Sequence, residues 1–164
     1  MSTNDPVPGD PVTLVQVRPF TPADHTAVLD LAPRLTVGIA PWLEREAALA
    51  AARGWLDGSI AGIGPDSAVF VAADAQGRCV GVVSVGRQRH FTGEEYAYIG
   101  ELAVAAAMEG RGLGRTLVVA AEAWAGARGY RLLALDTGTA NVRARRFYER
   151  LGYAEESIKL VKVL

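Results

Sequence analysis

The sequence predicts a mixed α/β fold with one central sheet, in which strands (β) and helices (α) follow one another as βααβββαβαβ. The first half holds β-rich runs joined by a short loop with a glycine, a pattern typical of antiparallel hairpins. The second half alternates short apolar runs with helical patterns, as a strand–helix–strand unit does. With 164 residues, 50% of them hydrophobic, the chain is long enough for one domain with a buried core.

The N-terminal residues 1–11 differ in composition from the rest of the chain. They include three prolines, one glycine and two aspartates, so we predict a disordered lead-in, with residues 12–164 forming the single domain. The expected strands lie at 14–20, 68–73, 79–86, 96–104, 132–135 and from 153 onward, and the expected helices at 22–32, 42–56, 112–128 and 141–151.

The boundaries of the first two helices follow from their terminal residues. Thr21 is a helix cap, with a proline in the first turn and an acid, Asp24, at the third helical position. Pro33 is expected to end this helix. Pro41 opens the second helix and a glycine weakens its end, so residues 58–65 are predicted to form a loop.

The later elements are predicted from hydrophobic patterning. A loop at 74–78 that contains a glycine joins two β-rich runs into a hairpin. The two helices of the second half each carry an apolar stripe and stop at a glycine, Gly129 and Gly152. The run 132–135 is wholly apolar, as expected for a central strand.

Composition argues against several classes of protein. The net charge is −1 without a basic surplus, so no nucleic-acid partner is expected. Cys79 is the only cysteine, which rules out an intramolecular disulfide, and His90 lacks neighbours at metal-ligand spacing, so no metal is expected. The chain shows no signal-peptide pattern and no apolar run near the roughly 20 residues of a membrane helix. We therefore expect a cytoplasmic protein without a membrane partner.

Residues 109–115 read Glu-Gly-Arg-Gly-Leu-Gly-Arg and lie between a predicted strand and a long predicted helix. Alternating glycines let a backbone approach a ligand closely, and the free N–H groups of a helix start favour an anion such as a pyrophosphate. Arg111 and Arg115 add positive charge at the same end. The segment lacks both the Gly-Lys-Ser/Thr of a Walker loop and the glycine offsets of a dinucleotide fingerprint, so it predicts a phosphate site of another kind.

Two segments resemble the signatures of the GNAT superfamily of N-acetyltransferases. The first is Tyr-Ile-Gly-Glu-Leu-Ala-Val at 98–104, followed by Arg-Gly-Leu-Gly-Arg at 111–115. The second is Asn-Val-Arg-Ala-Arg-Arg-Phe-Tyr-Glu-Arg-Leu-Gly-Tyr at 141–153. The resemblance covers about residues 67–157, with one helix and one strand between the two motifs. It departs from the family at Glu109, where Gln or Arg is usual, and we expect this side chain to point outward.

The resemblance implies a GNAT-like domain whose mixed, mostly antiparallel sheet is splayed where acetyl-CoA binds. Backbone groups at the strand end would pair with the pantetheine arm, and N–H groups of the glycine motif would hold the pyrophosphate. Asn141 would touch the cofactor near the pantetheine arm, which is compatible with a helix N-cap role, and Tyr148 would lie near the sulfur. The implied cofactor-binding residues are Leu102, Ala103, Val104, Glu109, Gly110, Arg111, Gly112, Leu113, Gly114, Arg115, Asn141 and Tyr148.

The implied reaction is transfer of an acetyl group to a primary amine by direct attack in a ternary complex, which needs a base and a weak acid. Tyr148 is the candidate acid because a phenol donates without ionising, although it could instead be a core aromatic. Glu101 is the candidate base, directly or through water, although it could instead be a solvent-facing residue of its strand. Glu94 and Glu95 are rivals, and in some relatives the base lies nearer the position of Tyr98.

The acceptor and the partners are less defined. The resemblance implies an amine pocket built from about residues 34–46 and 87–96, and both stretches mix acids with arginines. Small-molecule amines and peptides both stay open as acceptors. A non-catalytic CoA-binding or sensor domain and an enzyme for a larger acyl-CoA are the alternative functions. The segment 157–164 alternates polar and apolar residues, so a homodimer paired through it is possible.

Overall fold

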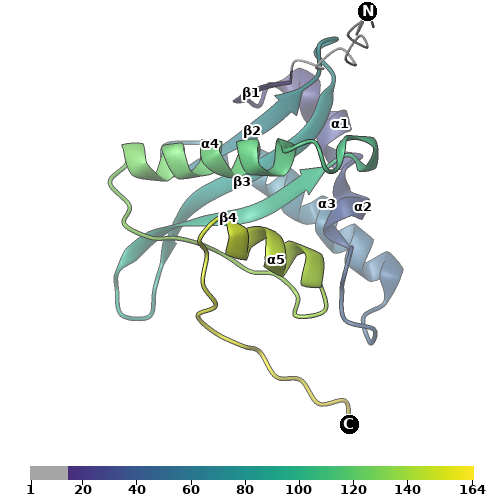
Figure 1. The fold of residues 1–164 in the computed structure, drawn as a ribbon, viewed down its shortest axis with the longest axis vertical. Helices are drawn as coiled ribbons and strands as arrows, with labels where there is room; N and C mark the ends of the chain where they lie inside the picture. Colours follow the sequence, from purple (N-terminus) through teal and green to yellow (C-terminus); the bar gives the residue numbers. More distant parts are fainter. Residues whose placement is uncertain (1–14) are drawn as a thin grey trace, which may run out of the picture.

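The structure is a computed structural model that describes residues 15–164. The predicted lead-in, residues 1–11, and Leu14, the start of the first predicted strand, lie outside these described residues. A five-stranded sheet in the order β1-β2-β3-β4-β5 forms the centre of the fold (Figure 1). The strands are β1 (Gln16–Pro19), β2 (Ser67–Ala73), β3 (Cys79–Arg89), β4 (Glu95–Val104) and β5 (Leu133–Leu135).

Strands β1 to β4 are antiparallel neighbours, and β5 lies parallel to β4. Helices cover both faces of the sheet, with α4 and α5 on one face and α1, α2 and α3 on the other (Figure 1). The helices are α1 (His25–Leu29), α2 (Ala32–Leu35), α3 (Arg45–Ala61), α4 (Leu113–Ala127) and α5 (Val142–Arg150), with 3-10 turns η1 (Pro22–Asp24) and η2 (Ala106–Met108). The predicted mixed α/β class with a mostly antiparallel sheet is confirmed.

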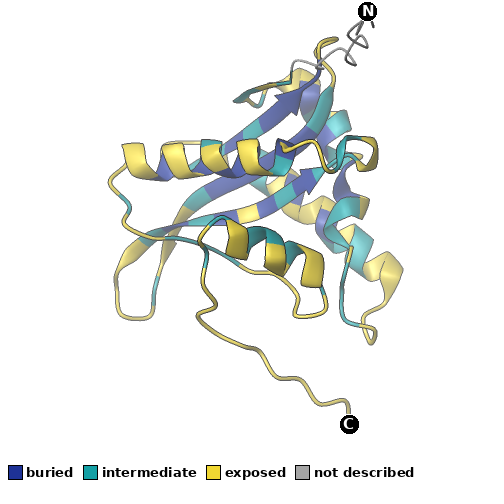
Figure 2. Ribbon diagram, viewed as in Figure 1, coloured by how far each residue is buried: buried dark blue, intermediate teal, exposed yellow. Residues whose placement is uncertain are grey.

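Each face of the sheet has its own hydrophobic core. Leu117 of α4 is fully buried in the core that includes Ile99 of β4, and Leu56 of α3 is buried in the core that includes Val71 of β2 (Figure 2). Full burial of one such side chain contributes roughly 1.5–3 kcal/mol. The two cores fix α3 and α4 on opposite sides of β4. None of the helices in residues 15–164 combines the length and apolar character that a bilayer crossing requires.

The N-terminal helical segment differs from its prediction. The helix expected at 22–32 consists of η1, α1 and the start of α2. Pro33 does not end a helix there, because it lies in the first turn of α2. Backbone N–H groups in a first turn have no intrahelical partner, so a proline there costs no hydrogen bond. Ala32, just before it, is fully buried and holds this turn against the sheet.

Helix α3 is longer at its C-terminal end than predicted. It begins at Arg45 rather than at residue 42 and continues to Ala61, so the loop predicted at 58–65 was wrong over its first residues. A glycine in a helix costs about 1 kcal/mol relative to alanine, which had suggested an early end. Burial of Ala52 and Leu56 against the sheet outweighs this cost.

A β-bulge interrupts the pairing of β3 with β4. Val83 pairs with Leu102 and Val85 pairs with Ile99, so Ser84 alone faces two residues of β4, Gly100 and Glu101. A Cβ atom at Gly100 would lie 2.8 Å from the Ser84 oxygen, and any larger residue would displace that hydroxyl. Glycine at position 100 therefore leaves room for the Ser84 hydroxyl beside Glu101.

Strand β5 follows β4 for only three residues. The paired residues of β4 end at Ile99, opposite Leu135, immediately before the bulge. Beyond this point the edge of β4 from Gly100 to Val104 has no strand neighbour on the β5 side among the described residues. This splay is the feature that the family resemblance had led us to expect.

The predicted closing strand from residue 153 onward was wrong. Residues 153–164 form no strand. Tyr153 still packs on the α4-side core and Glu155 pairs with Arg145, and the rest of the segment extends away from the body of the fold (Figure 1). Short β5 offers only three residues of pairing edge, and Leu160, in the middle of the expected strand, is 90% exposed. Pairing of this segment between two copies stays a prediction.

Candidate active site

The glycine motif forms the turn between η2 and α4. Gly110 and Gly112 adopt φ values of 73° and 82°, a left-handed backbone that other residues avoid. Gly112 is the N-cap of α4, and the first hydrogen bond at the start of α4 runs from Thr116 N to the Gly112 oxygen over 3.1 Å. The two glycines thus turn the chain so that α4 begins directly beside the end of β4.

The backbone N–H groups of residues 110–115 indicate a candidate anion site. None of them donates a hydrogen bond to an atom of the described residues. Free N–H groups and the positive end of the helix dipole both attract negative charge. Arg111 and Arg115 are exposed in the same segment and form no ion pair within residues 15–164. The segment therefore presents backbone donors and positive side chains together to an anion.

We had expected Glu109 to point outward, and this prediction was wrong. Its carboxylate pairs with Arg34 of α2 through one oxygen and with Arg143 of α5 through the other, the latter at 2.6 Å. The side chain of Glu109 is 28% exposed and lies between the two helices. Attraction by two arginines from opposite sides of the splay explains this orientation.

Arg34 also reaches the free edge of β4. Its Nε donates to the backbone oxygen of Val104 over 3.1 Å. Leu102 and Val104 pack toward the α4 side, while Ala103 is buried in the core under α3. The strand end thus alternates between the two cores, and its outer backbone edge has Arg34 as a polar neighbour.

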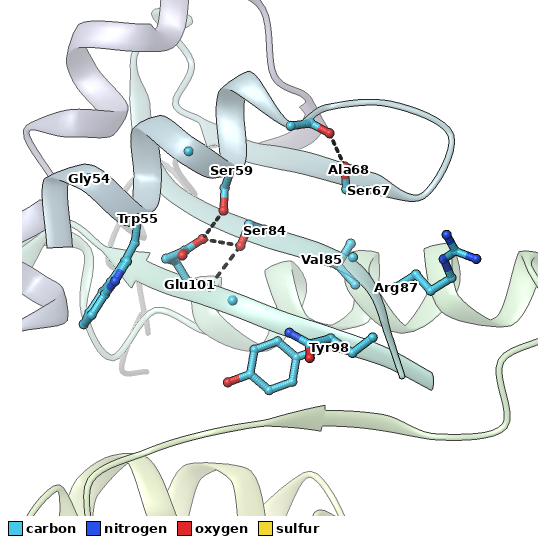
Figure 3. A pocket seen from close by; sticks show the side chains of 15 residues that line it. Gly54, Trp55, Ser59, Ser67, Ala68, Ser84, Val85, Arg87, Tyr98 and Glu101 are labelled. Atoms are coloured by element: carbon cyan, nitrogen blue, oxygen red, sulfur yellow. Dashed lines mark hydrogen bonds between the residues drawn. The ribbon is translucent and has the colours of Figure 1, made fainter. Parts of the chain in front are cut away.

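Glu101 is buried on the α3 side of the bulge, which excludes the solvent-facing alternative. It is 8% exposed, and its Oε2 accepts hydrogen bonds from Ser84 and, over 2.8 Å, from Ser59 (Figure 3). Ser84 in turn accepts from the Glu101 backbone N–H over 2.9 Å. Glu101 lies in the lining of a cavity of about 500 Å³ between α3 and strands β2 to β4.

The other candidates for a base lie in different surroundings. Glu95 pairs with Arg87 at 3.0 Å and with Arg89 at 3.4 Å near the turn between β3 and β4, and Glu94 is exposed in that turn. Tyr98 lines the same cavity as Glu101. Its hydroxyl donates to Asp136 over 3.0 Å, and burial together with this carboxylate raises the pKa of Tyr98. Glu101 is the buried carboxylate that the cavity contains.

Tyr148 packs on the α4-side core from helix α5. Burial raises the pKa of Tyr148 to about 12, and its hydroxyl makes no hydrogen bond within the described residues. Asn141 is the N-cap of α5, since its Oδ1 accepts from Ala144 N over 3.1 Å. Its Nδ2 donates to the Val37 oxygen over 3.2 Å, which ties α5 to the segment after α2.

A model of the Acetyltransferase (GNAT) family matches residues 26–153. The chain belongs to this family. A Pyrococcus furiosus protein provisionally assigned as an acetyl transferase shares the fold with a TM-score of 0.75 at 19% identity, over 92% of this chain and 100% of its own. Glucosamine-6-phosphate N-acetyltransferase from Arabidopsis thaliana gives 0.67 at 20% identity, over 92% and 98%. Aminoglycoside N-acetyltransferase AAC(6')-Iy gives 0.68 at 19%, over 96% and 98%. No curated protein matches the sequence.

The GNAT fold brings together residues that sequence reasoning had treated separately or missed. Ser59 and Ser84, the partners of Glu101, were not predicted, because their contacts join segments 42 and 17 positions away in the chain. One signal was available in the sequence, since glycines recur every fourth residue at 54, 58 and 62. His90 contacts Thr92, and no cluster of three metal-binding side chains occurs in residues 15–164.

Proposed function

We propose that this chain is an acetyl-CoA-dependent N-acetyltransferase that moves an acetyl group to a primary amine by direct attack in a ternary complex. The observation that carries the proposal is that the splay after Ile99 leads directly to the buried carboxylate of Glu101. The free N–H groups of residues 110–115 follow at the end of the same strand. Membership of the GNAT family supports acyl transfer, and the structure of AAC(6')-Iy in complex with CoA supports this donor.

The residues of the splay fit a coenzyme A-like ligand. The N–H groups of Gly110 to Arg115 would hold the pyrophosphate at the start of α4. The edge at Leu102, Ala103 and Val104, where Arg34 already donates to the Val104 oxygen, would pair with the amide groups of the pantetheine arm, as an added strand pairs with a sheet edge. Asn141 would contact the arm from the N-terminus of α5.

In the proposed reaction, one side chain accepts a proton and another donates one. Bound acetyl-CoA supplies a thioester carbonyl that an uncharged amine can attack. Glu101 takes a proton from the ammonium of the acceptor, which frees the nitrogen lone pair, and later releases that proton to water. As the C–N bond forms and the C–S bond breaks, Tyr148 gives its proton to the departing sulfur. The nitrogen loses its second proton to solvent, from which Tyr148 is reprotonated. A Tyr148 pKa of about 12 keeps the phenol protonated at neutral pH.

Two alternatives share the same cofactor site. One is a non-catalytic CoA-binding or sensor domain, and the other is an acyltransferase that uses a larger acyl-CoA. The buried position of Glu101 in a cavity beside the splay favours an enzyme, because a module that only binds CoA has no need of a carboxylate there. A cytoplasmic location and a homodimer stay predictions.

The test follows free thiol release from acetyl-CoA, propionyl-CoA and succinyl-CoA across a panel of amines. We expect amine-dependent release with acetyl-CoA as the best donor. Cys79 is the only cysteine, and burial raises the pKa of its thiol, so a reaction without CoA measures a small background. Tight CoA binding without transfer to any amine would favour the sensor domain instead.

A further inference from the structure

Glycines form part of the lining of the cavity under α3, and their lack of side chains leaves space there. Gly54 and Gly58 of α3, its C-cap Gly62, and two glycines of the sheet, Gly86 and Gly100, all line the cavity. Its volume of about 500 Å³ lies within the range of small-molecule sites. The glycine face of α3 (Gly54 and Gly58, with the C-cap Gly62) presents backbone without side chains to this space.

Packing does not explain two of these glycines. No atom lies within 4 Å of the place where a Cβ would stand at Gly54 or Gly58, and neither residue has a positive φ. Each glycine inside a helix costs about 1 kcal/mol relative to alanine. Both glycines are exposed and border the open side of the cavity, so a methyl group at either position would project into that space rather than into the core.

The charge of the cavity points to a cationic ligand. Glu101 is more than nine-tenths buried and takes part in none of the ion pairs within residues 15–164. Its Oε2 accepts from Ser59 and Ser84, whereas its Oε1 accepts from no described residue. A buried carboxylate without a cation is costly, so an ammonium group from a ligand would stabilise it.

The remaining lining limits what that ligand can carry. Glu101 is the only acid of the lining, so a second ammonium would find no partner there. Arg87 is its only base and already pairs with Asp66 at 2.9 Å and with Glu95 at 3.0 Å, so a carboxylate gains little from it. Trp55 and Tyr98 supply aromatic surface near Glu101 (Figure 3).

We propose that the acceptor is a primary monoamine on a flat apolar body, of the arylalkylamine class. Its ammonium would pair with Glu101, and its ring would lie along the glycine face of α3 beside Trp55 and Tyr98. The inference rests on the proposed acyltransferase function and narrows its substrate. A lysine side chain would satisfy Glu101, but an unbranched chain would leave much of a cavity that borders three strands unfilled.

The first experiment compares amines that differ in one property each. 2-Phenylethylamine and phenylalanine differ by a carboxylate, spermidine adds further ammonium groups, and a short lysine peptide replaces the ring by a methylene chain. We expect kcat/KM for 2-phenylethylamine to exceed the other three by about tenfold or more. Equal or faster transfer to spermidine, phenylalanine or the peptide would overturn the acceptor class and leave the acyltransferase proposal intact.

The second experiment fills the cavity with one methyl group. Gly58→Ala should raise the KM for 2-phenylethylamine about tenfold without changing the Kd for CoA. Gly126→Ala in α4 is the matched control, because a Cβ there also meets nothing within 4 Å but lies outside the cavity. Both changes should raise Tm through helix propensity, so a KM effect confined to Gly58→Ala reports the cavity rather than stability.

Direct binding separates the two proposals. Calorimetric titration of 2-phenylethylamine into the CoA-loaded protein should show binding that Gly58→Ala weakens and Gly126→Ala does not. Such binding without turnover of any amine would uphold the acceptor site while removing the enzyme function. An acceptor KM or Kd that Gly58→Ala leaves unchanged would overturn the inference.

Discussion

Arg34 Nε donates to the backbone oxygen of Val104 over 3.1 Å, at the strand edge that we propose for the pantetheine arm. The same guanidinium pairs with Glu109, whose second oxygen pairs with Arg143. One carboxylate thus bridges two arginines from α2 and α5 beside the proposed phosphate site and offsets one of their two positive charges. Glu109 stands where the GNAT family usually has Gln or Arg, and neither of those residues carries the negative charge on which this network depends.

The network predicts that Glu109→Gln tightens CoA binding about threefold to tenfold, because it removes a negative charge and frees Arg34 and Arg143. Calorimetric Kd values at low and high salt provide the measurement, and the gain should shrink at high salt. Glu149→Gln on α5 is a control with the same charge change at an exposed site. Weaker binding in Glu109→Gln would mean that the carboxylate supports the site instead of competing with the phosphate.

Tyr148→Phe tests the proposed acid. Turnover should fall about 10-fold to 100-fold, because the departing sulfur loses its proton donor, while the Kd for CoA stays within about twofold. Tyr153→Phe is the matched control, since its ring lies 5.6 Å from that of Tyr148 but its hydroxyl donates to Glu122. Equal rates in wild type and Tyr148→Phe would leave Tyr148 as a core aromatic only.

Local patterns in the sequence were enough for the fold class and for the glycine motif. The α4 stripe and the turn at Gly110 and Gly112 depend on neighbours within a few positions, and both occur as predicted. The orientation of side chains could not be predicted from local patterns. The direction of Glu109 depends on Arg34, 75 positions away, and no local pattern contains that contact.

The same distinction explains the errors in the helices and strands. Glycine propensity suggested that α3 ends early, but burial of Leu56 on the far side of the helix keeps it intact. Alternation at 157–164 suggested a strand, but a strand also needs an edge to pair with, and β5 provides only three residues. Tertiary contacts, and not local propensity, therefore determine where α3 ends and whether residues 157–164 form a strand.

Asp24 gives a prediction for stability against pH. Two hydrogen bonds from Arg18, each 2.7 Å, lower the pKa of Asp24 from 3.8 to about 2, with further bonds from Thr21. A lowered pKa in the folded state adds stability above pH 4 that is lost as the pH falls toward 2. The shift corresponds to about 2 kcal/mol.

Asp24→Asn should therefore lower the free energy of unfolding at pH 7 by about 2 kcal/mol and flatten its decline between pH 5 and pH 2. Urea titrations at several pH values measure this, with Asp30→Asn, an exposed aspartate of the same segment, as the control. A variant whose stability falls with acid as steeply as wild type would assign the decline to other carboxylates.

Glu101→Gln tests the proposed base by its pH dependence. At pH 7 the acceptor is mostly an ammonium ion, so loss of the base should slow transfer about 100-fold. The deficit should shrink as the pH rises toward the pKa of the amine, because solvent then removes the proton that Glu101 would have taken. The measurement is kcat/KM against pH for Glu101→Gln and for Glu95→Gln, the rival carboxylate on β4. A deficit in Glu101→Gln that is equal at every pH would indicate that Glu101 only positions the amine. A loss in Glu95→Gln alone would move the base to the turn between β3 and β4.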